Sequence, residues 1–158
     1  ALLISPASIS QMVAGKALVG MFYGLLAAGI VYALNLRLVV HWEIAILAAV
    51  CGTAFAVSFG LLLGILFDNP QNMNPWFAIG LLVLMLPLFM TSLMAGDSPS
   101  IVRAVLSWLP STLLYKAFVS SFAGSVSWAE IAGNVVMVLA YTAALLALTV
   151  RRMRRLDR

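Results

Sequence analysis

The sequence predicts an all-α integral membrane protein with four transmembrane helices and a re-entrant helical hairpin before the last span. Hydrophobic residues make up 64% of the chain and charged residues only 9%, whereas soluble domains carry about 25% charged residues. A soluble protein could not keep so much apolar surface away from water. We therefore expect one transmembrane domain over residues 1–158. Because the chain opens with Ala1 in the middle of an apolar pattern, we also expect it to be a piece of a longer protein.

Four apolar stretches approach the length of about 20 residues that a membrane helix needs. They lie at residues 17–36, 44–67, 76–95 and 128–150. The loop 68–75, which follows the second stretch, is rich in asparagine and proline, which favour turns. Pro87 lies in the middle of the third stretch. Membrane helices tolerate such a proline, usually with a kink.

The distribution of basic residues predicts the orientation. Five of the nine lysines and arginines lie in the tail 151–158, directly after the last apolar stretch. Basic residues gather on the cytoplasmic side of a membrane, so the tail is expected to be cytoplasmic, in the cell (inner) membrane. With four spans, the opening segment 1–16, which ends at Lys16, lies on the same side. The loops near His41 and Asp97 are then external.

The stretch 99–122 is predicted to form a hairpin that dips into the outer leaflet. Pro110 divides it into two short helices, and Arg103 and Lys116 make a full crossing costly. A full crossing would also put Lys16 and the basic tail on opposite sides. The alternative is a pair of amphipathic helices resting on the membrane surface. Non-helical backbone at membrane depth must be buried in protein or line a cavity, so a hairpin suggests a gate, formed by Trp108, Pro110 and Ser111.

Small residues recur at every fourth position of the second expected span. They are Ala48, Gly52, Ala56, Gly60 and Gly64. The first expected span repeats the pattern at Gly20, Gly24 and Ala28. This spacing places small side chains on one helix face, where another helix can approach closely. The alternative is chance, because alanine and glycine are common in this chain.

The sequence gives no sign of catalysis, and we expect no cofactor and no metal. No ionisable residue lies at the centre of an expected span, as a proton relay would require. No phosphate-binding glycine loop, paired histidines or activated nucleophile is present. His41, beside Trp42, is expected to be interfacial. The basic tail is expected to be a membrane anchor, so no nucleic-acid partner is expected.

The order of short motifs resembles the second half of a permease subunit of the type-2 ABC exporters. The motifs are Ser5-Pro6-Ala7-Ser8, Gly15-Lys16, Asn69-Pro70-Gln71-Asn72 and Trp108-Leu109-Pro110-Ser111. Permeases of that family have six spans, so the missing pair would lie upstream of Ala1. The resemblance implies alternating access, with ATP hydrolysis on a separate ABC ATPase subunit. It also implies a dimer with a second permease copy or a paralogue, within the lipid bilayer.

The resemblance assigns a role to the opening segment. A short stretch before the first span is similar to the coupling helix that rests on the ATPase, and its residues here are Ile4, Ser5, Pro6, Ala7, Ser8 and Ile9. The alternative is a plain interfacial lead-in to the membrane. For the whole chain, the rival interpretations are part of an ion-gradient-driven secondary transporter and a non-transporting membrane scaffold.

Overall fold

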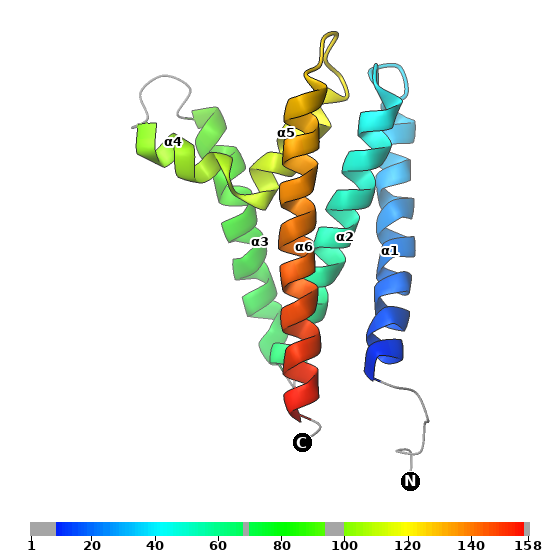
Figure 1. The fold of residues 1–158 in the computed structure, drawn as a ribbon, viewed down its shortest axis with the longest axis vertical. Helices are drawn as coiled ribbons and strands as arrows, with labels where there is room; N and C mark the ends of the chain where they lie inside the picture. Colours follow the sequence, from blue (N-terminus) through cyan, green and yellow to red (C-terminus); the bar gives the residue numbers. More distant parts are fainter. Residues whose placement is uncertain (1–8, 68–69, 94–99, 157–158) are drawn as a thin grey trace.

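The computed structural model describes residues 9–67, 70–93 and 100–156, and over these residues the chain is helical without any strand (Figure 1). The all-α prediction is confirmed. The six helices are α1 (Ile9–Leu34), α2 (Trp42–Leu66), α3 (Pro70–Leu93), α4 (Ser100–Ser107), α5 (Pro110–Ser120) and α6 (Trp128–Leu156).

Three of these helices contain a segment long and apolar enough to cross a membrane. The segments are Gln11–Leu34, Trp42–Leu66 and Trp128–Met153. The apolar part of α3 is shorter and runs from Asn74 to Phe89. The chain is therefore a multi-pass membrane protein with three long apolar spans.

The long helices run side by side along one axis of the molecule (Figure 1). The start of α1 and the end of α6 lie at one end of the bundle. The loop 35–41 between α1 and α2, and the loop 121–127 between α5 and α6, lie together at the other end. The two cationic segments, around Lys16 and after Val150, therefore share one end of the bundle, as the expectation that they lie on the same side requires.

Helix α2 is central and packs against α1, α5 and α6. One core cluster joins α2, α5 and α6 through Cys51, Phe55, Leu113 and Val138. A second cluster joins the end of α1, the loop that follows it and the start of α2, through Tyr32, Val39 and Ala45.

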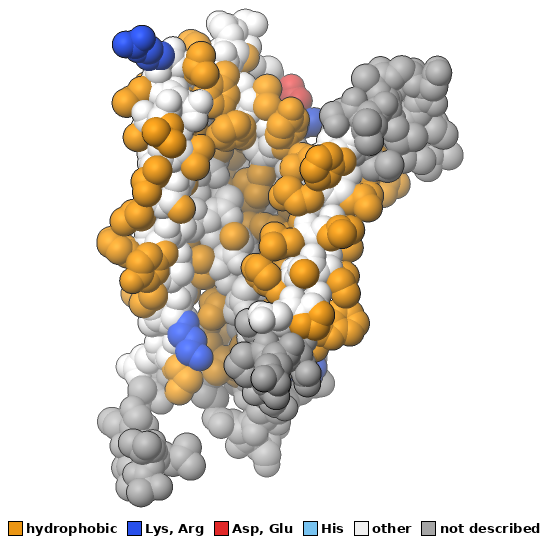
Figure 2. Space-filling model, turned by 180° about the vertical axis from the view of Figure 1, so that it is seen from behind, with side chains coloured by type: hydrophobic (Ala, Val, Ile, Leu, Met, Phe, Trp, Pro, Cys, Tyr) orange, Lys and Arg blue, Asp and Glu red, His pale blue; other side chains and the backbone are white. Residues whose placement is uncertain are grey.

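Most of the large apolar side chains point outward instead of into this core. Phe22 and Tyr23 of α1 and Phe89 of α3 are each about two-thirds exposed, and apolar side chains cover the visible face in Figure 2. Inside the bundle, several hydroxyl groups are satisfied locally. Thr142 and Thr149, both buried, donate to the backbone carbonyl four residues earlier, which is the usual solution for such residues within a helix. An apolar exterior over a bundle with internally paired hydroxyls suits a lipid surrounding.

Three helices extend well beyond the apolar stretches that predict them. Helix α3 begins at Pro70, so that residues 70–75 of the expected loop 68–75 are helical and Pro75 lies within the helix. Helix α1 begins at Ile9, so Lys16 is the eighth residue of this helix, although the apolar stretch starts at residue 17. Helix α6 continues past Val150 through the arginines to Leu156. Hydropathy marks the part of a helix that lies in lipid, whereas backbone hydrogen bonding carries the helix on into the polar region.

Candidate functional site

The hairpin region forms two short helices joined by Trp108 and Leu109. Pro110 is the first residue of α5, a position where its missing N–H and fixed φ suit a helix start. In Figure 1, α4 lies across the direction of the long helices, whereas α5 rises behind α6 to the end where α6 begins.

The tip of the hairpin lies part-way along the length of the bundle. The Tyr141 hydroxyl of α6 donates a hydrogen bond to the Trp108 carbonyl over 3.1 Å. Tyr141 is 13 residues beyond Trp128, the first residue of α6, and at 1.5 Å per residue this is about 20 Å along the helix axis. The hairpin tip is therefore level with the middle of α6.

The backbone carbonyls at this break receive side-chain donors. Besides the bond from Tyr141, the Thr112 hydroxyl lies 2.5 Å from the Leu106 carbonyl oxygen and 2.7 Å from that of Leu109, so one donor serves both. The same two carbonyls accept backbone N–H donors, from Leu109 at 3.3 Å and from Leu113 at 3.1 Å. The break between α4 and α5 is thus closed by backbone and side-chain hydrogen bonds together.

The other end of α5 is fastened to the loop between α1 and α2. The carbonyl oxygen of Ser121, a fully buried residue, accepts hydrogen bonds from the backbone N–H groups of Val40 and His41, at 2.9 Å and 3.0 Å. The Ser121 hydroxyl donates to the Phe118 carbonyl. Phe118 also packs its ring against Tyr32 of α1, with ring centroids 5.7 Å apart. Two loops distant in sequence are therefore held together at this end of the bundle.

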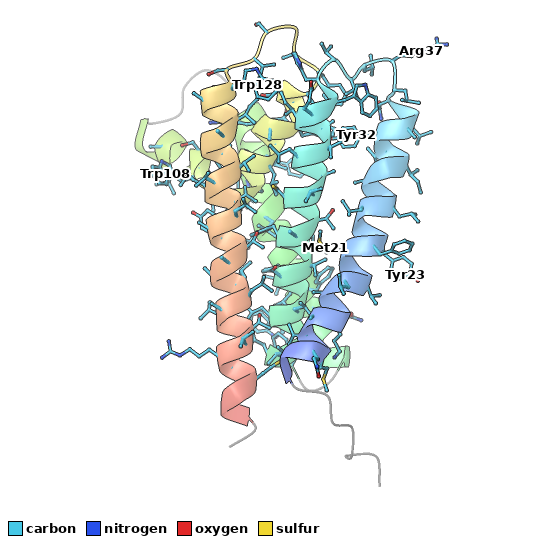
Figure 3. All side chains as sticks on the ribbon, turned by 45° about the vertical axis from the view of Figure 1, so that its right-hand side comes forward. Met21, Tyr23, Tyr32, Arg37, Trp108 and Trp128 are labelled. Atoms are coloured by element: carbon cyan, nitrogen blue, oxygen red, sulfur yellow. The ribbon has the colours of Figure 1, made fainter. Side chains whose placement is uncertain are left out.

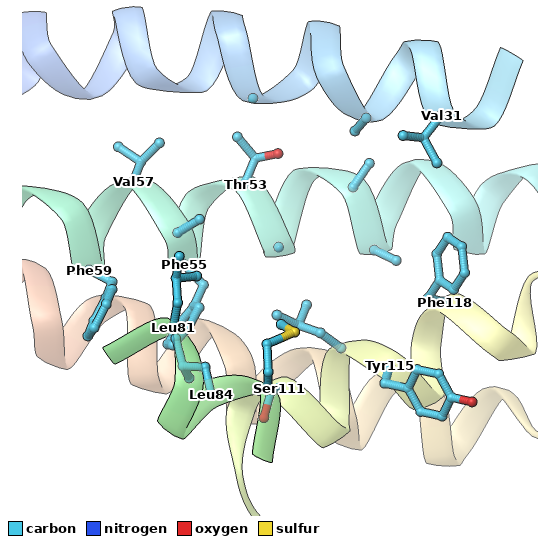
Figure 4. Close-up of a pocket in the computed structure, with 18 of the residues that line it drawn as sticks. Val31, Thr53, Phe55, Val57, Phe59, Leu81, Leu84, Ser111, Tyr115 and Phe118 are labelled. Atoms are coloured by element: carbon cyan, nitrogen blue, oxygen red, sulfur yellow. The ribbon is translucent and has the colours of Figure 1, made fainter. Parts of the chain in front are cut away.

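A groove of about 710 Å³ runs between the α1–α2 side and the α3–α5 side of the bundle (Figure 4). It is visible as the hollow in Figure 2. Its walls are almost entirely apolar, and the hydroxyl groups of Tyr32, Thr53, Ser111 and Tyr115 are the polar side chains in its lining. The volume falls within the range of about 300–1,000 Å³ typical of ligand sites. The groove could therefore bind a molecule through apolar contacts and a few isolated hydrogen bonds.

Some of the small residues of α2 line this groove and others do not. Ala48, Gly52 and Ala56 line the groove. A Cβ atom added at Gly52 would meet Leu114 of α5 at 3.5 Å, whereas one added at Gly60 or Gly64 would have no neighbour within 4 Å.

The closest helix contact is made by the glycines of α1. A Cβ atom at Gly20 would lie 2.9 Å from Val57, and one at Gly24 would overlap the methyl group of Thr53. Figure 4 shows Thr53 and Val57 pointing from α2 toward α1. The glycines of α1 thus permit α1 and α2 to approach closely.

The structure places the residues of the expected gate in different surroundings. The Trp108 side chain is 62% exposed and points away from the bundle (Figure 3), whereas Pro110 and Ser111 are buried. The buried Ser111 hydroxyl has no hydrogen-bond partner among the described residues. Of the expected coupling segment, residues 4–8 lie outside the described residues, and Ile9 is the first residue of α1.

Sequence reasoning missed the groups that fasten the hairpin. Thr112, Ser121 and Tyr141 lie in apolar stretches and belong to no motif that the sequence singled out. A local signal existed only for Thr112, because a hydroxyl residue just after a proline break is well placed to bond the preceding carbonyls. Over the residues described, no group of three or more histidines, cysteines or acidic residues could hold a metal ion.

The comparisons with known proteins give one match. A family model described as ABC-2 family transporter protein matches residues 1–151. No curated protein and no solved structure matches the chain significantly. Because the family match covers all but residues 152–158, the chain belongs to the ABC-2 family of transporter proteins.

Proposed function

We propose that this chain is the membrane-spanning permease subunit of an ATP-driven ABC exporter, which forms the translocation path and couples to a separate ATPase subunit. The observation that carries the proposal is the family match over residues 1–151. A second permease copy or a paralogue would complete the path. In this assembly, α3 serves as a fourth span, and its 24 residues are long enough to reach about 36 Å.

The contacts of α1 support a mechanical route from the ATPase to the hairpin. Helix α1 is continuous over 26 residues, or about 39 Å. It begins at Ile9, the last residue of the expected coupling segment, and ends at the loop 35–41. That loop holds the end of α5 through the Ser121 carbonyl. Motion of the coupling segment would therefore reach α5 through one helix and two backbone hydrogen bonds.

The hairpin is proposed to enter and leave on the external side of the membrane. Its support is the depth of the tip beside Tyr141 together with the return of α5 to the end where α6 begins. Single cysteines at positions 98 and 125, in a Cys51→Ala background, should react with an impermeant thiol reagent from the same side. Reaction from opposite sides would mean a fifth crossing and would exclude the hairpin.

The coupling role is tested by placing a charge in the expected contact. Ile4→Asp and Ile9→Asp should weaken assembly with the ATPase subunit or separate ATP hydrolysis from export. Burying an unpaired charge in an apolar interface is costly. An aspartate at the start of α1 does not oppose the helix, because negative charge is favourable at a helix N-terminus. Loss of coupling could then not be attributed to melting of α1.

The measurement is co-purification of the ATPase subunit, with ATP hydrolysis and export assayed on the same preparation. Leu38→Asp is the matched control, because Leu38 is 62% exposed in the loop at the opposite end of the bundle. It should insert and assemble normally. Normal assembly and export in both Ile4→Asp and Ile9→Asp would refute the coupling role.

A further inference from the structure

The two arms of the hairpin are held very differently. Helix α5 packs against α2, α3 and α6, whereas the backbone of α4 approaches only α3 and α5 among the described helices. Four residues of α5, from Ser111 to Ala117, are buried or nearly so, namely Ser111, Thr112, Leu113 and Ala117. Near the tip, α4 is more exposed, and the Val105 side chain is 62% exposed. Only α5 is therefore built into the core.

A cavity separates the tip-proximal part of α4 from α6. It has a volume of about 450 Å³ and is lined by Ala104, Val105, Trp108, Leu109 and Tyr141. Tyr141 is the only residue of α6 in this lining. The hydrogen bond from its hydroxyl to the Trp108 carbonyl joins two residues of this lining and is the one hydrogen bond between the hairpin tip and α6 that the structure shows in its described part.

The backbone at the tip permits α4 to turn without disturbing α5. Leu109 has an extended conformation, with φ −68° and ψ 140°, before α5 begins at Pro110. Proline donates no backbone hydrogen bond, so a movement of α4 breaks no bond from the first backbone position of α5; the bond from the α5 start to α4 that would be released is that of the Thr112 hydroxyl to the Leu106 carbonyl. Trp108 and Leu109 are bonded to the last turn of α4 through their backbone N–H groups, which donate to the Val105 and Leu106 carbonyls. Two side-chain donors hold this end of α4 to its neighbours, namely the Thr112 hydroxyl at the Leu106 carbonyl and the Tyr141 hydroxyl at the Trp108 carbonyl.

We infer that α4 is a flap that turns about Trp108 and Leu109, and that Tyr141 of α6 is the positioning residue that holds the base of this flap through the Trp108 carbonyl. The inference deepens the hairpin of the proposed function and rests on it. While the bond is made, α4 stands off α6 with the cavity between them. When the bond is released, α4 turns while α5 stays in the core, and the cavity changes shape.

The test removes the hydroxyl of Tyr141 and observes α4 and α5 separately. A nitroxide spin label is attached to a single cysteine, either at Val105 on α4 or at Val119 on α5, in full-length Cys51→Ala permease in lipid nanodiscs. Both positions are exposed, Val105 at 62% and Val119 at 43%. Loss of one hydrogen bond in a membrane protein shifts an equilibrium by about three- to tenfold. Tyr141→Phe should therefore raise the ratio of mobile to immobile label at 105 by about that factor, and leave 119 unchanged.

The control is Tyr23→Phe, which removes a hydroxyl from an outward-facing tyrosine of α1 (Figure 3). It should leave both spectra unchanged. A second pair of variants tests the same holding point, because Thr112→Val removes the other hydroxyl donor and Thr112→Ser retains it. Thr112→Val should mobilise the label at 105, and Thr112→Ser should not.

Two outcomes would overturn the flap. An unchanged spectrum at 105 in both Tyr141→Phe and Thr112→Val would show that these hydroxyls do not hold α4. Equal mobilisation at 105 and 119 would show that the whole hairpin loosens and that α5 is no fixed base. The spectra require no ATPase subunit, so failure of the coupling experiment with Ile9→Asp would leave this result intact. Conversely, an immobile flap would leave the exporter proposal standing.

Discussion

Replacing Gly24 by alanine should push α1 away from α2. Gly24 lies on the face of α1 that meets Thr53, and a Cβ atom there would overlap the Thr53 methyl group. Thr53 is buried, and its β-branched side chain has few alternative rotamers in a helix. The added methyl group therefore cannot be accommodated by a small side-chain movement, and the helices must separate.

The magnitude follows from comparison with a second glycine of the same helix. Gly29 has no neighbour within 4 Å of its added Cβ atom, so Gly29→Ala changes only the intrinsic preference for helix, by about 0.5–1 kcal/mol in favour of alanine. Gly24→Ala gains the same preference and adds an overpacking cost of about 1–3 kcal/mol. The preference cancels in the comparison, so the two variants should differ by about 1–3 kcal/mol.

The assay is thermal unfolding of the two purified variants in the same detergent. For a chain of this size each kcal/mol corresponds to about 2–4 °C in Tm, and Gly24→Ala should melt below Gly29→Ala by that scale. Thr53→Ser removes the overlapping methyl group and should restore most of the loss in a Gly24→Ala background. Equal Tm values for the two alanine variants would refute the close approach of α1 and α2.

Two further predictions concern the core and the topology. Leu113→Ala removes a side chain only 3% exposed in the main core cluster, and should lower the unfolding free energy by about 2–5 kcal/mol, whereas Leu139→Ala, at a site 47% exposed, should change it little. A thermal or denaturant melt of each variant decides this. In a Cys51→Ala background, a cysteine at position 154 should react with an impermeant reagent from the cytoplasm and one at position 41 from outside. External reaction at 154 would reverse the proposed orientation.

The sequence was sufficient for those features that depend on residues close together in the chain. The apolar stretches predicted a helical membrane protein, and Pro110 indicated the break at which α5 now begins. The small residues at four-residue spacing could be recognised as helix faces. Which neighbour each face meets could not be recognised, because Gly52 is beside Leu114 of α5 and Gly24 is beside Thr53 of α2. Such pairings depend on how the helices are arranged in space.

The hydrogen bond from Tyr141 to Trp108 shows the same limit for the candidate site. The two residues are 33 positions apart, and tyrosines are common near membrane surfaces. Nothing local distinguishes Tyr141 from Tyr23, which points out of the bundle. The groove was equally inaccessible to sequence reasoning, because four helices contribute to its walls. Its apolar lining is, in composition, like the rest of the chain.

The pairing of the loop 35–41 with Ser121 has a consequence for protein engineering. Val40 and His41 both hold the Ser121 carbonyl, so the length of that loop is matched to the end of α5. An epitope tag or a reporter domain inserted into 35–41 would displace both donors at once. Gly124 and Ser125, in the other loop, are exposed and take no part in this pairing. Exposed loop tips tolerate insertions best, so the 124–125 junction is the natural site for a tag on this face of the membrane.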